Sequence, residues 1–304
     1  MVLKPEMQDR LVTATAANGT VSLVGGIATD LVREAQERHA LAPTASAAVG
    51  RLITGAALLG ASLKGRERLT LQIEGDGPIG AIVADAWSGA EGVVEARAYA
   101  RHPGADVPLN ARGKFDVAAV VGAGRLQVTK SYEVGQPYNG IVPLASGEIG
   151  DDLAAYLLSS QQVASVVALG VLANPSGIVA AGGVIAQLMP GADEETVALL
   201  ERNANAMLPV TQQIAEGAGA ELLLRAVTAG LELKIFRDYR LRFGCRCTRE
   251  KVETALLVLG RDELAKIVTE QPQTEATCEF CKRRYVLSAG EVNDLIARLD
   301  TAKR

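Results

Sequence analysis

The stretch FGCRCTRE, residues 243–250, places two cysteines, Cys245 and Cys247, one residue apart. A second close pair follows in CEFC, which holds Cys278 and Cys281, and the 304-residue chain contains no other cysteine. The pattern is therefore C-x-C, thirty residues, then C-x-x-C. Two close pairs separated by a segment that folds back are typical of a tetrahedral zinc site with four thiolate ligands. The four cysteines are thus predicted to bind one zinc ion when reduced.

The residues around the cysteines predict a small unit that depends on the metal. Residues 248–260 and 261–270 have the patterns of two short helices that return the chain, and residues 283–299 those of a strand followed by a helix. Ser288 and Glu291 stand at the spacing of a helix capping box. Because a unit of roughly 60 residues has little core of its own, metal binding is expected to supply much of its folding free energy.

Positive charge surrounds the predicted site. Four thiolates around one zinc ion carry net negative charge, and cationic neighbours favour the thiolate over the thiol. The neighbours expected to act in this way are Arg242, Arg246, Arg249, Lys282, Arg283 and Arg284. Thiolates are better metal ligands and also better targets for oxidants. The spacing alone leaves open both an inert structural zinc ribbon and a functional site.

The one-residue spacer of the C-x-C pair favours a redox role. Zinc ribbons generally use C-x-x-C at both ends, whereas C-x-C also allows its two sulfurs to bond directly in a tight, strained ring. Strained disulfides have higher reduction potentials and are often regulatory. Oxidation would remove ligands, release the metal and forfeit folding free energy on the order of 10 kcal/mol, a loss that few small domains survive. The pattern predicts an oxidant-triggered unfolding switch.

Strand and helix patterns alternate over the first 190 residues and predict one α+β domain. Residues 69–87 have alternating apolar side chains on both sides of a Gly-Asp-Gly-Pro turn, which predicts a hairpin. Residues 176–192 are expected to repeat this arrangement of strand, glycine turn and strand. Residues 42–63 predict a helix with Thr44 as its N-cap. Other strands are expected within 20–32, 92–101, 124–132 and 138–145, with helices after residue 28 and from about residue 150.

After Pro190 the chain becomes rich in alanine and leucine, and the helical pattern is interrupted by a proline and several glycines. Short, broken helices are marginal alone and need a surface to pack against. We therefore divide the chain into an α+β domain at 1–190, a metastable helical linker at 191–235 and a small C-terminal zinc-binding redox-switch domain at 236–304.

Composition and charge narrow the function classes. With 48% apolar and 22% charged residues the chain has the composition of a soluble globular protein. The net charge of −4 argues weakly against a general nucleic-acid binder, although residues 236–304 carry 14 Lys+Arg against 11 Asp+Glu. No signal-peptide pattern is present at residues 1–14, and the apolar stretch 52–63 is shorter than the about 20 residues of a membrane span. We expect a cytoplasmic protein without a membrane partner.

Motifs along nearly the whole chain carry a family resemblance. FGCRCTREKVETALLVLGRDELAKIV (243–268) and CEFCKRRYVLSAGEV (278–292) stand in the C-terminal part, and LTLQIEGDGPIGAIVADA (69–86) and AAGGVIAQLMPGA (180–192) stand upstream. In this order they resemble the heat-shock protein 33 family of bacterial redox-regulated chaperones. Lys282 departs from the family pattern, because many relatives have a small residue after the last cysteine.

The resemblance implies a zinc-bound, inactive reduced state with one zinc ion per chain. In the family, oxidation pairs the cysteines within each motif, here Cys245 with Cys247 and Cys278 with Cys281. Zinc then leaves, and the C-terminal domain and the adjoining linker unfold. The resulting ATP-independent holdase, usually a dimer, captures unfolding proteins under oxidative and heat stress. The implied partners are thus client proteins and a second copy of the chain, and no enzymatic active site is expected.

Two functions from other classes are alternatives to this one. A zinc-ribbon nucleic-acid-binding protein has the positive C-terminal unit in its favour and predicts salt-dependent binding to DNA or RNA. A thiol-disulfide oxidoreductase would use Cys278 and Cys281, but such a pair usually begins a helix, whereas here it leads into KRRYVLS, a strand pattern. The glycine motifs at 75–80 and 180–184 lack the spacing and the lysine of a phosphate-binding loop, and tight turns are expected there.

Overall fold

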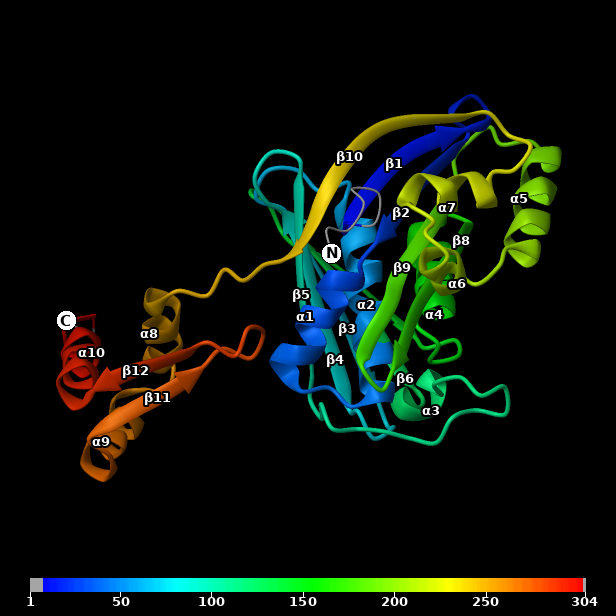
Figure 1. The fold of residues 1–304 in the computed structure, drawn as a ribbon. Helices are drawn as coiled ribbons and strands as arrows, with labels where there is room; N and C mark the ends of the chain where they lie inside the picture. The colour runs from blue at the N-terminus through cyan, green and yellow to red at the C-terminus, as the bar shows by residue number, and fades with distance from the viewer. Residues whose placement is uncertain (1–7, 303–304) are drawn as a thin grey trace. The chain divides into compact units, whose positions relative to one another are not determined.

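The computed structural model describes residues 8–302. The chain divides into two compact units, a larger one that ends at Gly244 and a smaller one that begins at Cys245. Figure 1 shows the larger unit as a twisted sheet with helices on both faces, and the smaller unit as three helices beside a two-stranded hairpin. Each combines helices and strands, as the predicted α+β class requires.

Within the described residues, ten strands of the larger unit form a single sheet in the order β7-β6-β3-β4-β5-β10-β1-β2-β9-β8. Neighbouring strands are antiparallel except β5 and β10, which are parallel. The strands are β1 (Arg10–Ala16), β2 (Val21–Ile27), β3 (Arg68–Gly75), β4 (Ala81–Ser88), β5 (Val93–Ala100), β6 (Gly124–Ser131), β7 (Tyr138–Pro143), β8 (Ser165–Asn174), β9 (Gly177–Leu188) and β10 (Leu233–Phe243). The last strand in sequence thus lies inside the sheet, between β5 and β1.

One face of the sheet packs against α1 (Thr29–His39), α2 (Pro43–Gly60), α3 (Val117–Val121) and α4 (Gly150–Gln161). Helix α2 is buried nearly all round, and its small residues allow close approach to the strands. A methyl group added at Gly60 would lie 2.8 Å from the Ala86 Cβ. The helix is therefore the centre of the main core.

The opposite face, over β1, β2 and β9, is covered by α5 (Glu194–Ala206), α6 (Val210–Ala215) and α7 (Ala220–Val227). Because side chains alternate across a strand, Leu11 of β1 belongs to the main core, whereas Val12 belongs to this second core. The predicted helical segment at 191–235 therefore has a surface to pack against.

The division between the units falls later in the chain than the boundary that we expected at residue 236. Strand β10 pairs with β1 along Leu233–Arg240 and with β5 along Arg240–Phe243. These ladders hold residues 233–243 in the sheet of the larger unit, so the compact smaller unit begins only at Cys245.

Two local predictions were wrong. Residues 177–188 form the single continuous strand β9, paired with β2 and β8, instead of a strand, a glycine turn and a strand. A side chain at Gly182 would meet the Gly26 carbonyl oxygen at 2.4 Å, so the glycine serves a close approach between strands. Helix α2 begins at Pro43 with Ala42 as N-cap, and Thr44 instead donates its hydroxyl to Asp106 at 2.5 Å.

The smaller unit contains α8 (Arg249–Leu257), α9 (Arg261–Glu270), β11 (Gln273–Thr277), β12 (Arg284–Ser288) and α10 (Ala289–Ala302). Strand β11 was not expected, but the predicted helices and the strand after Cys281 are present. Up to residue 299, its fully buried aliphatic residues are Leu264, Leu287, Val292 and Leu295. The unit therefore has only a minimal apolar core.

Asp9, directly before β1, is a buried acid that caps α1. Its carboxylate accepts the backbone N–H groups of Asp30 at 3.0 Å and Leu31 at 2.6 Å. Burial nevertheless raises the pKa of the Asp9 carboxyl from 3.8 to about 7, because desolvation outweighs these hydrogen bonds. The native protein therefore keeps a proton on Asp9 at pH values at which the unfolded chain has lost it.

This difference predicts a pH dependence for the larger unit. The contribution of Asp9 to stability is fully present below pH 3.8 and is lost as the pH rises toward 7. Between pH 5 and pH 7 the loss is expected to be about 2 kcal/mol. Urea unfolding followed by the fluorescence of Trp87, the single tryptophan, should show this loss in the wild type and not in Asp9→Asn. An unchanged slope in Asp9→Asn, or a slope lost equally in the neighbouring Asp30→Asn, would contradict the assignment.

Candidate metal centre

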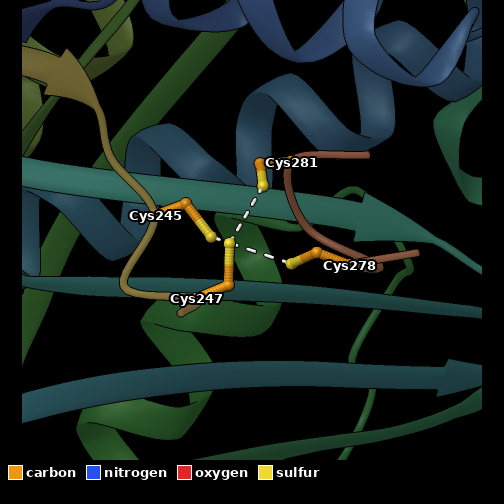
Figure 2. A group of neighbouring side chains, drawn as sticks. All are labelled: Cys245, Cys247, Cys278 and Cys281. Atoms are coloured by element: carbon orange, nitrogen blue, oxygen red, sulfur yellow. Dashed lines mark hydrogen bonds between the residues drawn. The ribbon is translucent and has the colours of Figure 1, made fainter. Parts of the chain in front are cut away.

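The sulfur atoms of Cys245, Cys247, Cys278 and Cys281 meet at one point of the smaller unit. All four lie within 4.8 Å of one another, with 3.8 Å between Cys245 and Cys278 and 3.4 Å between Cys247 and Cys281. Figure 2 shows the sulfurs pointing toward a common centre. A tetrahedral site with metal–sulfur bonds of about 2.3 Å has edges of about 3.8 Å. The four thiols, which form no disulfide, are thus placed to hold a metal ion.

Local backbone structure positions each pair. Cys245 and Cys247 lie in the irregular segment before α8, and the N-cap of that helix, Thr248, accepts the Lys251 N–H at 3.3 Å. Cys278 begins the turn between β11 and β12, where its N–H donates to the Arg283 carbonyl at 3.0 Å. The C-x-C pair is therefore fixed by a helix start and the C-x-x-C pair by a hairpin turn.

Lys282, the position that departs from the family pattern, has a left-handed backbone with a φ of 58°. Only glycine adopts this conformation without strain. The turn still closes, since the Lys282 N–H donates to the Cys278 carbonyl at 2.9 Å, and the lysine side chain pairs with Glu279 at 2.9 Å. The bulky residue therefore strains the turn without preventing its formation.

Most of the expected cationic neighbours bind carboxylates rather than the sulfurs. Arg284 pairs with Glu275 in the hairpin, and Lys282 with Glu279. The other pairs are Arg242 with Glu95 in the larger unit, and Arg249 with Glu253 and Glu291. The expectation that these four cations chiefly offset thiolate charge was therefore wrong. Arg283 differs, because its pKa is raised first by Tyr285 and then by the charges of Cys247 and Cys281.

Burial raises the pKa values of two of the thiols, whereas the basic residues in the sequence suggested lowered values. Desolvation is the largest cause that raises the pKa of Cys278, and it raises the pKa of Cys281 to about 12. Without a metal these two thiols stay protonated at neutral pH. A bound cation is what would hold them as thiolates, and four sulfur donors suit a soft or borderline ion such as zinc.

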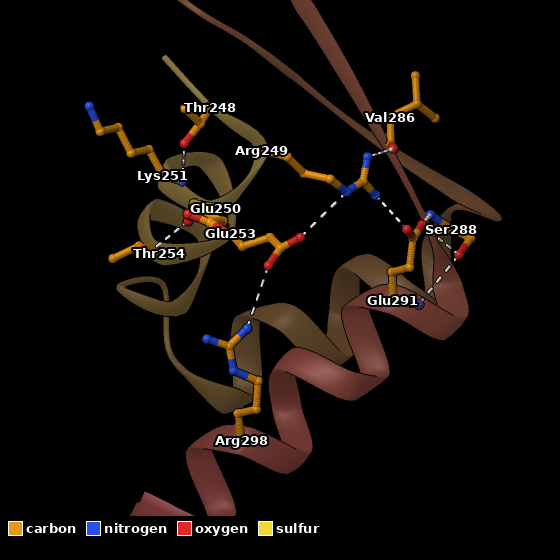
Figure 3. Close-up of polar contacts among 10 residues, drawn as sticks. All are labelled: Thr248, Arg249, Glu250, Lys251, Glu253, Thr254, Val286, Ser288, Glu291 and Arg298. Atoms are coloured by element: carbon orange, nitrogen blue, oxygen red, sulfur yellow. Dashed lines mark hydrogen bonds and ion pairs between the residues drawn. The ribbon is translucent and has the colours of Figure 1, made fainter. Parts of the chain in front are cut away.

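Arg249 joins the cysteine-bearing segment to the rest of the small unit (Figure 3). It donates to the Val286 carbonyl of β12 at 3.1 Å and to Glu291 of α10 at 2.5 Å. Glu291 also completes the predicted capping box, because it accepts the Ser288 N–H at 2.8 Å while its own N–H donates to the Ser288 hydroxyl at 3.3 Å. The predicted capping box is therefore confirmed. The exposed ion pair between Arg249 and Glu291 contributes only about 1 kcal/mol or less to stability.

Tyr285 is a residue of the site that the sequence did not single out. Its hydroxyl donates to the Cys247 sulfur at 3.1 Å. Hydrogen bonds from outer residues to metal ligands typically change metal affinity 10–100-fold. We expect Tyr285→Phe to weaken zinc affinity about tenfold in competition with a chromogenic chelator, whereas the control Tyr132→Phe, in the larger unit, should have no effect. Equal affinity in all three proteins would show that this hydrogen bond has no role in ligation.

Other signals in the sequence have structural explanations. The Gly-Asp-Gly-Pro motif forms the turn between β3 and β4, where the Gly75 N–H donates to the Gly80 carbonyl at 2.9 Å. The C-x-x-C pair leads into strand β12, as its sequence indicated, and not into a helix. Within residues 8–302, no helix combines the length and the apolar character that crossing a membrane requires.

Comparisons with known proteins agree over most of the chain and extend into both units. The family model described as Hsp33 protein matches residues 9–288. The 33 kDa chaperonin of Bacillus subtilis (strain 168) is 45% identical over 289 residues, which cover 94% of this chain and 98% of the relative. That of Staphylococcus aureus (strain Newman) is 41% identical over 293 residues, with 96% and 99% covered. The crystal structure of the heat shock protein 33 homolog from Thermotoga maritima matches with a TM-score of 0.86 at 34% identity, covering 96% of this chain and 98% of its own.

Proposed function

The chain belongs to the Hsp33 family of chaperones, and from this premise we propose that it is a redox-regulated, ATP-independent holdase. In the reduced state Cys245, Cys247, Cys278 and Cys281 would hold one zinc ion, and the protein would be inactive. Oxidation would convert it into a form that binds unfolding proteins under oxidative and heat stress. We propose that it acts in the cytoplasm, that the active form is a dimer, and that it has no enzymatic activity.

The observation that carries this proposal is the contrast between the cluster of four thiols and the small core around it. The four sulfurs lie within 4.8 Å of one another, whereas only four aliphatic side chains are fully buried among the residues of the unit whose burial is described, 245–299. A unit of this size depends on its metal for folding. Loss of the ligands is therefore expected to unfold it.

Oxidation of the thiols supplies the switch. A peroxide removes two electrons from each pair of zinc-bound thiolates, takes up two protons from solvent and is reduced to water while one S–S bond forms, so two equivalents oxidise all four cysteines. By family resemblance we propose the pairs Cys245–Cys247 and Cys278–Cys281. A sulfur that is engaged in a disulfide is no longer a thiolate ligand. Peptide mapping of the oxidised protein by mass spectrometry would identify the pairs, and cross-motif disulfides would refute them.

The helices of residues 191–235 provide a surface that unfolding can expose. Helices α5, α6 and α7 cover an apolar sheet face on β1, β2 and β9. Short helices lose their structure readily without stabilising neighbours. We propose that this linker becomes unstable when the smaller unit unfolds, so that its apolar side chains and the sheet face beneath them bind clients.

One experiment tests zinc binding and activation together. A chemically unfolded client is diluted into solutions of the chaperone, and its aggregation is followed by light scattering beside a zinc-release dye. The reduced protein should hold one zinc ion per chain and leave aggregation unchanged, whereas peroxide with mild heat should release zinc and suppress aggregation. Equal suppression in both states would refute the redox switch and leave the zinc site standing. A gel shift with DNA and RNA across salt concentrations tests the nucleic-acid alternative, which salt-dependent binding would support.

A further inference from the structure

A groove of about 750 Å³ lies in the larger unit, where β8 meets the segment between α5 and α6. Its volume falls in the roughly 300–1,000 Å³ range of small-molecule sites. Most of its wall is apolar, and three of the leucines in it are strongly exposed: Leu109 at 58%, Leu172 at 39% and Leu208 at 53%. An exposed apolar hollow of this size is typical of a binding site.

The charged side chains of the groove leave hydrogen-bond donors free. Arg51 of α2 uses Nη1 to donate to the Glu148 carbonyl oxygen at 3.2 Å and to the Glu148 carboxylate. Its buried Nε has no acceptor among the described residues, and no partner is found there for Nη2 either. Because Nε is itself shielded from solvent, Nη2 is the guanidinium donor left for an anion in the groove, through one charge-assisted hydrogen bond.

The remaining charges also favour a monoanion. Lys114 is exposed on the loop that forms one wall, and within residues 8–302 its ammonium group has no ion-pair partner. Glu216, the one acid of the lining, already accepts the Gln212 side-chain amide at 3.0 Å. The groove therefore offers two cations with unused donors beside a long apolar wall.

We propose that this groove binds an aliphatic monocarboxylate, a fatty-acid-like amphiphile. Its carboxylate accepts a hydrogen bond from Nη2 of Arg51 with Lys114 nearby, and its chain lies along the apolar side chains of β8 and of the α5–α6 connection. A neutral hydrocarbon would leave the free donors unused, and a polyanion would leave the apolar wall uncovered. A ligand with one anionic head and one apolar tail matches both the free donors and the apolar wall.

Binding at this position would join two parts of the larger unit. Thr211 of α6 already lies directly over Gly170 of β8, where an added methyl group would be 2.6 Å from its Cγ2 atom. A ligand between β8 and Met207–Val210 adds contacts only while this segment is folded, and so stabilises it by mass action. Under the proposed redox function, on which this consequence alone rests, the ligand would raise the oxidant dose that activation needs.

Isothermal titration calorimetry of the reduced full-length protein with decanoate tests the binding step without a chaperone assay. We expect one site per chain and weaker binding of decan-1-ol, which has the same chain without the charge. Arg51→Met should weaken decanoate binding about tenfold or more, the effect of losing a charged hydrogen bond, and Lys114→Met a few-fold. Lys64→Met, an equal change of charge at a residue outside the groove, is the matched control.

Several outcomes would overturn the proposal. These are no decanoate binding up to about 1 mM, equal affinity for decanol and decanoate, or unchanged affinity in both cation variants. Competition with decanoate by an apolar peptide amide, equally strong in the wild type and Arg51→Met, would show a peptide groove instead. Because Arg51→Met removes the partner of Glu148, the exposed Lys114 supplies a test that does not depend on the folding of the first variant.

Discussion

Removing the metal from the reduced protein is expected to unfold residues 245–302, to destabilise the linker at 191–235 and to leave the rest of the larger unit folded. Among its described residues the smaller unit buries only four aliphatic side chains completely, and a unit of this size has little core of its own to fold without a metal. Zinc bound by four thiolates typically contributes about 10–16 kcal/mol. Hydrogen exchange followed by mass spectrometry should therefore show α8, α9 and α10 losing protection when a strong chelator is added under reducing conditions.

The larger unit supplies the internal control, because its cores contain no part of the metal site. Its strands away from the linker should keep their protection, and zinc added back should restore that of the smaller unit. Cys245→Ser should imitate the chelator, with weaker metal binding and a poorly folded C-terminal unit even when reduced. A purified chain without metal, with reduced cysteines and a protected α9, would refute the dependence on the metal.

The sequence predicted the cluster of four thiols better than the sheet of the larger unit. Ligand spacing is a local property, so C-x-C and C-x-x-C were enough to bring four sulfurs together. The insertion of β10 between β5 and β1 could not be read locally, since it depends on pairing with strands more than a hundred residues away. Likewise Gly182 and Gly183 resembled a turn, although Gly182 actually permits a close approach to β2.

The expected effect of the basic residues on the thiols was wrong for a related reason. The six basic residues near the cysteines suggested low thiol pKa values, but which carboxylate each one meets depends on the tertiary fold. Three of the basic side chains form ion pairs with Glu95, Glu275 and Glu291. Burial, in addition, raises the pKa of the Cys281 thiol. Tyr285 was missed because a hydroxyl directly after a basic run gives no signal of a bond to Cys247 until the hairpin has formed.

Loosening the linker without touching the cysteines is expected to activate the chaperone in its reduced state. Leu224 of α7 is fully buried in the second core, and a methyl group added at Gly25 of β2 would lie 2.9 Å from its Cδ2 atom. Truncation of such a leucine to alanine costs about 2–5 kcal/mol. Leu224→Ala should therefore raise hydrogen exchange in α5–α7 roughly 30-fold or more and suppress client aggregation without oxidant.

The comparison with Leu222→Ala makes this prediction specific. Leu222 lies two residues earlier in the same helix but is 56% exposed, so the same chemical change should leave both exchange and activity near the wild-type values. Zinc content must be measured in each protein, because activation of Leu224→Ala with its zinc retained would place the client-binding surface under the linker. Activation accompanied by zinc loss would instead mean that the change acts through the thiol site. An inactive Leu224→Ala with a freely exchanging linker would show that exposing this sheet face is not sufficient for client binding.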